Sequence, residues 1–288
     1  MHWLFFAFLN ALFHSISTAL GKRGAQKVDA YSAAWSQSFF ALLVIVPIAY
    51  FTQSFQPVTQ MFWVAITVAS LLHVCATVLF FKAIKDSPLS LVMPILSLTP
   101  VFLLISSPLI LGEFPSPLGV VGILVMVVGS YILNLSKRTK GIFEPLTSIV
   151  KEKGTREMFY VAVLWSIASN FDKIGVTSAN PILWTVATFS ALTFYMTLIL
   201  LYKRISFKPI FRHVSVFAPI GLTIGLSNLF QMIAISMTIV PNVIAMKRTS
   251  SLFGIIWGKL FFNETNIKER FLGAAVMLIG VILIVLSS

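Results

Sequence analysis

Residues 109–129, LILGEFPSPLGVVGILVMVVG, return in altered form at residues 260–280, LFFNETNIKERFLGAAVMLIG. In each segment an apolar run ends near a glutamate, and a short gap leads into a second apolar run with two glycines seven residues apart. The same offset of 151 residues joins five identical pairs without a gap: Lys22 and Lys173, Ala83 and Ala234, Glu113 and Glu264, Gly122 and Gly273, and Gly129 and Gly280. We therefore interpret the chain as a duplication.

The composition is that of an integral membrane protein. Of the 288 residues, 58% are hydrophobic and only 10% are charged, and the mean hydropathy is +0.94. A soluble domain carries about 25% charged residues. The net charge is +12, but the cations lie in short loops between apolar runs, so no nucleic-acid partner is expected. The single cysteine, Cys75, excludes an internal disulfide framework and a thiolate metal cluster. No cofactor or metal is expected.

Ten apolar runs are long enough to cross the roughly 30 Å of hydrocarbon in a bilayer. The longest polar stretch, residues 136–156, divides them into two sets of five. We predict an all-α, multi-pass protein of the cell membrane, with one five-helix repeat at 1–135, a linker at 136–156 and a second repeat at 157–288. The expected spans are 2–20, 30–51, 61–81, 88–110, 117–135, 157–175, 181–201, 213–238, 241–262 and 269–286.

The charge distribution predicts that the two repeats are inverted in the lipid bilayer. Five is an odd number, so the second repeat must begin on the opposite side from the first. Of the 21 lysines and arginines, 18 fall in or at the margins of the loops after spans 1, 3, 5, 7 and 9. The loop after span 1 is basic, whereas its repeat partner after span 6 carries only Lys173. By the positive-inside rule, the 136–156 linker is cytoplasmic and both ends of the chain lie outside.

With these features the chain resembles the EamA family of the drug/metabolite transporter superfamily. The resemblance covers ten spans, two repeats, and in each repeat a Glu followed by a Gly-containing last span, Glu113 to Gly129 and Glu264 to Gly280. A proline-rich fourth span, SPLSLVMPILSLTPVF at 87–102, also suits the family. The resemblance implies alternating access around a central cavity near the bilayer midplane, built from spans 1, 3, 4, 6, 8 and 9. It names no substrate.

Two adjacent cations, Lys247 and Arg248, lie inside the ninth span, IVPNVIAMKRTSSLFGIIWGKLFF at 239–262. Each costs roughly 2.5–3.5 kcal/mol in hydrocarbon on insertion scales, so we expect both to face a polar cavity and to bind an anionic small molecule. Arginine offers a planar fork for a carboxylate or phosphate, and lysine a mobile point charge. The segment NVIAMKRTSSLF is similar to the Lys-Arg segment with which triose-phosphate translocators grip a phosphate. The alternatives are that both cations pair with internal acids or that they snorkel to the surface.

Further polar residues are placed along other spans at helical spacing. The remaining candidate substrate-binding residues are Asn10, His14, His73, Thr77, Asn170, Asp172, Lys173, Asn228 and Gln231. Asp172 is expected to be the resting partner of Lys247 or Arg248. Hydrogen bonding between helices is the alternative explanation for the neutral members. His14 or His73 could carry a coupling proton, and a counter-substrate would serve the same purpose. The glycines at 122, 129, 273 and 280 predict close helix packing, within the chain or in a homodimer.

These observations leave two transport hypotheses. The first is a secondary transporter for a small anionic or zwitterionic metabolite. The second is an exporter of neutral amino acids or cationic compounds, in which the Lys-Arg pair is structural and Asp172 attracts the substrate. An intramembrane enzyme is disfavoured because the chain has no His-Glu-x-x-His and no Gly-x-Gly-Asp motif. A non-catalytic scaffold would not explain cations kept at a cost inside a span.

Overall fold

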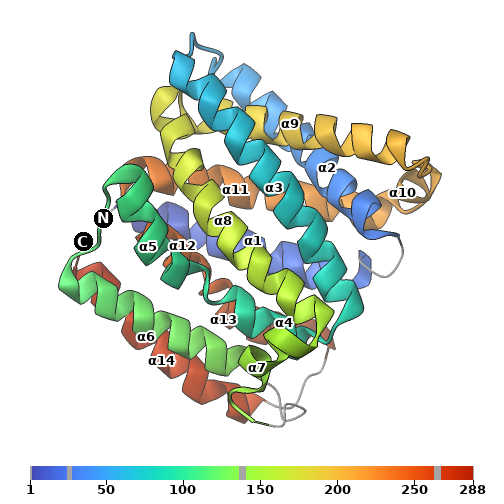
Figure 1. Ribbon diagram of the computed structural model, residues 1–288. Coiled ribbons are helices and arrows are strands. Elements are labelled where there is room, and N and C mark those ends of the chain that lie inside the picture. The colour runs from blue at the N-terminus through green and yellow to red at the C-terminus, as the bar shows by residue number, and fades with distance from the viewer. Residues whose placement is uncertain (1, 25–27, 136–140, 263–266, 288) are drawn as a thin grey trace.

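The computed structural model describes residues 2–24, 28–135, 141–262 and 267–287, and within these ranges all regular structure is helical (Figure 1). The helices are α1 (His2–Gly24), α2 (Ala30–Phe51), α3 (Gln60–Asp86), α4 (Leu89–Leu96), α5 (Thr99–Leu111), α6 (Pro117–Asn134), α7 (Glu144–Lys151), α8 (Lys153–Ser178), α9 (Pro181–Tyr202), α10 (Lys208–Arg212), α11 (Val214–Met237), α12 (Val240–Lys247), α13 (Ser250–Phe262) and α14 (Ile267–Leu286).

Seven helices among the described residues are long and apolar enough to cross a membrane, and they support a helical membrane protein. They are His2–Gly21, Ala30–Phe51, Gln60–Asp86, Leu89–Leu111, Pro117–Asn134, Pro181–Tyr202 and Val214–Met237. The fourth of these contains both α4 and α5. The count of ten spans and the inverted orientation of the repeats remain predictions.

Helix bounds recur at the offset that the sequence suggests. Adding 151 to the bounds of α2 gives the bounds of α9, and the same holds for α4 with α12 and for α5 with α13. Local chemistry recurs as well. Asp29 caps α2 by accepting hydrogen bonds from the backbone of Tyr31 and Ser32, and Asn180 caps α9 by accepting one from Leu183.

The fourth and ninth expected spans are each interrupted, at Ser97–Leu98 and at Arg248–Thr249. In the fourth span Pro100 lacks the N–H that would bond Leu96, and the hydroxyl of Thr99 donates to that carbonyl instead, at 2.8 Å. In the ninth span the backbone tightens, with i to i−3 hydrogen bonds from Arg248 and Thr249. The sequence did not predict either break, and the second one places the Lys-Arg pair where the helix is interrupted.

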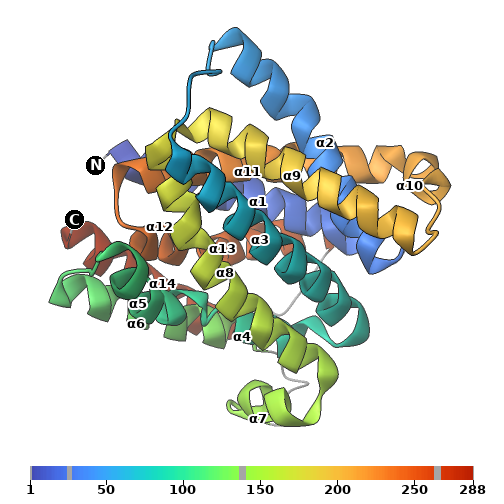
Figure 2. The ribbon, with the colours of Figure 1, turned by 45° about the horizontal axis from the view of Figure 1, so that its top comes forward.

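Helices α6 and α14 lie side by side (Figures 1 and 2), and their glycines set the distance between them. A Cβ on Gly129 would lie 2.5 Å from the backbone nitrogen of Met277, and one on Gly280 would lie 2.6 Å from that of Met126. Of the two packing roles that the glycines predicted, the structure shows the one within the chain. These glycines are therefore not available as a homodimer contact.

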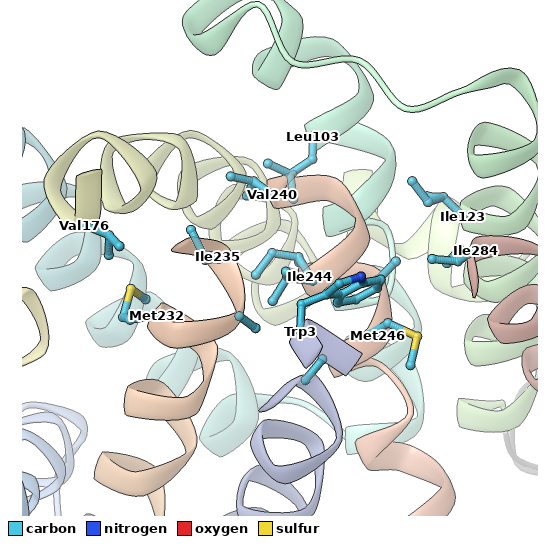
Figure 3. Close-up of a cluster of buried hydrophobic side chains, with 14 of the residues drawn as sticks. Trp3, Leu103, Ile123, Val176, Met232, Ile235, Val240, Ile244, Met246 and Ile284 are labelled. Carbon is cyan, nitrogen blue, oxygen red and sulfur yellow. The ribbon is translucent and has the colours of Figure 1, made fainter. Parts of the chain in front are cut away.

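One end of the helix bundle is filled by a hydrophobic cluster (Figure 3). Trp3 from the start of α1, Leu103 from α5, Val176 near the end of α8 and Ile235 near the end of α11 contribute to it. Figure 3 shows Val240 and Ile244 of α12 among these side chains. The opposite end carries α7, a short helix within the expected linker, and α10. The cluster thus closes the end of the bundle at which α8 and α11 finish.

Candidate functional site

A cavity of about 390 Å³ lies among the helices and extends away from the end of the bundle that the hydrophobic cluster fills. It is lined by α1, α3, α4, α8, α11, α12 and α13, which correspond to the expected spans 1, 3, 4, 6, 8 and 9, and also by α2, α9 and the end of α6. Ala19 near the end of α1, Leu89 at the start of α4 and Leu135 after α6 mark its far rim. The rim therefore faces the end that carries the basic loops.

The Lys-Arg pair lies on the wall of this cavity. The ammonium of Lys247 donates a 2.7 Å hydrogen bond to Oε1 of Gln231 on α11. Arg248 is only 9% exposed, and its buried Nε has no hydrogen-bond partner among the described residues. A buried guanidinium N–H without an acceptor is costly, so an incoming oxygen ligand would relieve that cost.

Asp172 of α8 pairs with a histidine. Its carboxylate lies 3.1 Å and 3.2 Å, by its two oxygens, from Nε2 of His73 on α3. The indole Nε1 of Trp184 donates to the same carboxylate at 3.1 Å. The side chain of Asp172 is fully buried, whereas that of His73 is 17% exposed. The expected ion pair of Asp172 with Lys247 or Arg248 is not formed, because these two contacts already occupy the carboxylate.

Lys173, the next residue, points away from the cavity. Its Nζ donates to the carbonyl oxygens of Ile235 at 2.7 Å and of Thr238 at 2.9 Å, and it lies 3.5 Å from Oε1 of Glu113. The other oxygen of Glu113 accepts a hydrogen bond from the backbone of Val240 at 3.1 Å. Lys173 therefore adds no charge to the site. The charged wall consists of Lys247, Arg248 and Asp172, which leaves one net positive charge when the histidines are neutral.

The remaining candidates divide into two groups. His14, Thr77, Asn228 and Gln231 line the cavity together with His73. Asn10 and Asn170 do not line it. Asn10 is fully buried and accepts a 2.8 Å hydrogen bond from Ser227, which joins α1 to α11.

Asn170 donates to Ser106 at 3.0 Å and so joins α8 to α5. For Asn10 and Asn170 the structure shows the interhelical hydrogen bonding that was the alternative explanation.

Two residues of the site escaped sequence reasoning. Trp184 reads as an ordinary apolar residue of its span, but its indole holds Asp172 in place. Gly175 lies one turn of α8 beyond Asp172, and any Cβ there would overlap the ring of Trp184. The glycine therefore allows the tryptophan to pack against α8 and reach the carboxylate. Trp184 lies 12 residues after Asp172 and 9 residues after Gly175, and this spacing gives no sign of the contact in the sequence.

Chemically, the site offers two cations and neutral hydrogen-bonding groups on one part of the wall, and aromatic side chains elsewhere. Phe80, Trp165, Phe189 and Trp257 supply the aromatic surface. Such a cavity suits a small molecule with an anionic head group and an apolar body.

Comparisons with known proteins agree with this architecture. The profile of the EamA-like transporter family matches residues 1–135 and again residues 157–286. A solved crystal structure aligns with a TM-score of 0.79 and 15% sequence identity, covering 100% of this chain and 99% of the other. At that identity the likeness shows the fold alone. The curated proteins contain no significant match.

Proposed function

The chain belongs to the EamA-like transporter family, and from that premise we propose that it is a secondary transporter for a small anionic or zwitterionic metabolite. Lys247 and Arg248 would bind the anionic group, and the substrate would reach alternate sides of the membrane as the two repeats rearrange. The observation that carries the proposal is the guanidinium of Arg248, which is buried on the cavity wall and whose Nε has no hydrogen-bond partner in the described part of the chain.

The charge balance of the wall supports a substrate of negative or zero net charge. Lys247 and Arg248 outnumber Asp172, and the ammonium of Lys247 already rests on a neutral acceptor, Gln231. An anion can therefore approach Lys247 without displacing an internal carboxylate. In this proposal, four further lining residues complete the hydrogen-bonding wall: His14, His73, Thr77 and Asn228.

The alternative, export of neutral amino acids or cationic compounds, needs Asp172 as the attracting group. Its carboxylate is fully buried and is held by His73 and Trp184. A cationic substrate would have to break these contacts before reaching it. The geometry therefore supports the anionic reading over this alternative.

A thermal-shift screen of the purified protein tests the proposal. Anionic metabolites should raise the melting temperature more than neutral or cationic analogues of the same shape, because a ligand at a hundred times its Kd adds about 2.7 kcal/mol. The stabilisation should be lost in Arg248→Gln and kept in Lys203→Gln, whose cation is exposed at the end of α9. Equal stabilisation of the wild type and Arg248→Gln would contradict the proposal.

A further inference from the structure

The contact between His73 and Asp172 is arranged as a site for a proton. Asp172 accepts from two N–H groups, the indole of Trp184 and Nε2 of His73, which satisfies a fully buried carboxylate. That bond fixes the proton of a neutral His73 on Nε2. The imidazole is the exposed member of the pair and lines the cavity. A proton can thus reach the histidine from the cavity without disturbing the carboxylate.

The charges around His73 can be named helix by helix. Asp172 faces it from α8, while α2, α4 and α9 present only uncharged residues, such as Gln37, to the cavity. The same cavity is also lined by His14 of α1, Lys247 of α12 and Arg248. The charge of Asp172 acts on Lys247. The contact of His73 with Asp172 is therefore coupled electrostatically to the two cations.

His14 is a poorer candidate for the same task. The charges of Lys247 and Arg248 both act on it, and its Nδ1 is buried without a hydrogen-bond partner among the described residues. No carboxylate among the described residues pairs with it. Two like charges and no counter-charge disfavour a second proton on that ring. Of the two histidines on the wall, His73 is the one that contacts a buried carboxylate within the described ranges, and the two can share the proton.

We propose that His73, held by Asp172, binds a proton together with the anionic substrate, so that the two are co-transported. The inference rests on the proposed function. With His73 neutral the wall carries one net positive charge, and a proton would raise it to two. An anion beside Lys247 and Arg248 offsets that repulsion, so the anion and the proton each favour the binding of the other. The proton comes from the water on the loading side and leaves on the other, and no covalent bond changes.

Sulfate is a suitable probe, because its charge is constant through the range in which histidine titrates. Calorimetry of sulfate binding to the purified full-length protein, in two buffers with different ionisation enthalpies, counts the protons taken up. The wild type should take up protons as sulfate binds, and its affinity should rise on the order of tenfold as the pH is lowered. His73→Gln should bind sulfate without proton uptake. His213→Gln, with its substitution at the start of α11, should behave as the wild type.

A measurement without ligand separates this inference from the proposed function. Nuclear magnetic resonance of ¹⁵N-histidine protein, with the His73 signal assigned by its loss in His73→Gln, follows that ring through a pH titration. Arg248→Gln should change the pH titration of this ring, because it removes a charge that shares the cavity with the imidazole.

The outcomes divide cleanly. Sulfate binding with proton uptake that persists in His73→Gln overturns the inference and leaves the proposed anion site standing. If sulfate fails to bind the wild type, that result contradicts the proposed anion site. The titration of His73 in Arg248→Gln then tests the present inference. An unchanged His73 titration in Arg248→Gln overturns the inference, whereas a shifted one upholds the link between the histidine and the cation.

Discussion

The ammonium of Lys173 lies 3.5 Å from Oε1 of Glu113, although the two residues belong to opposite halves of the chain. Lys173 also holds the last carbonyls of α11, and Glu113 holds the first backbone N–H of α12 through Val240. The pair therefore ties α8, α11 and α12 together at the end filled by the hydrophobic cluster in Figure 3. Both side chains are mostly buried, so solvent screens them only in part.

Lys173→Ala should lower the free energy of unfolding by about 1–3 kcal/mol, because it leaves a part-buried carboxylate and two carbonyls without their donor. Thermal unfolding in detergent measures this. Lys153→Ala is the matched control, since Lys153 is 66% exposed and 3.8 Å from Asp86. That control should change stability by about 0–1 kcal/mol. If both variants lost the same free energy of unfolding, the contacts of Lys173 would contribute no more to stability than an exposed ion pair does.

Gly280→Ala should destabilise the protein by about 1–3 kcal/mol, because its Cβ would lie 2.6 Å from the backbone of Met126 and force α6 and α14 apart. The control is Gly21→Ala in α1, where a Cβ meets nothing within 4 Å. Alanine there should be neutral or stabilising by up to about 1 kcal/mol, given its helix propensity. Melting temperatures compare the two, and a tolerated Gly280→Ala would argue against close packing of these helices.

Gln231→Glu should convert the neutral acceptor of Lys247 into an internal counter-ion. The fold should keep its stability, since the 2.7 Å contact can be retained with opposite charges. The affinity for anions should fall by on the order of tenfold or more, because the new carboxylate neutralises one of the two cations. Binding titrations with the anion found in the thermal-shift screen measure this change. Undiminished affinity in Gln231→Glu would place the anion away from Lys247.

The orientation of the chain can be tested by fusions. A fluorescent protein placed in the 136–156 linker should fluoresce, and alkaline phosphatase fused after Ser288 should be active, because 18 of the 21 cations lie on the linker side. Strong cytoplasmic fluorescence from a fusion at Ser288 would reverse the orientation and leave the duplication untouched.

The helices were predictable where apolar length and capping chemistry coincide. The expected span 30–51 coincides with α2, and 181–201 differs from α9 by one residue, because Asp29 and Asn180 cap helices that begin where hydrophobicity begins. The breaks at Ser97 and Arg248 were not predicted. Hydropathy does not mark the break in the fourth span, and in the ninth span the polar Lys247 and Arg248 were interpreted as a binding site. Both breaks arise from the backbone geometry around Pro100 and around an i to i−3 turn. Glu264 and its loop lie outside the described residues.

The site was predictable only in part, because sequence periodicity gives the face of a helix but not its depth or its neighbour. Thr77 and Asn228, which the offset of 151 aligns, both line the cavity. Sequence reasoning also paired Asp172 with Lys247 or Arg248, because opposite charges in the same half of the membrane attract each other. The structure gives Asp172 a histidine and an indole instead, through the contact of α3 with α8 and the packing space at Gly175.

The central claim is that Lys247 and Arg248 bind the anion during transport. The most direct measurement is uptake, into proteoliposomes, of the anion that best stabilises the wild type. Lys247→Gln and Arg248→Gln should each lower uptake at least on the order of tenfold while the protein stays folded, because removing one charge partner of a desolvated ligand costs about 2–5 kcal/mol. Lys203→Gln should transport as the wild type does. Wild-type uptake by both cavity variants would contradict the account.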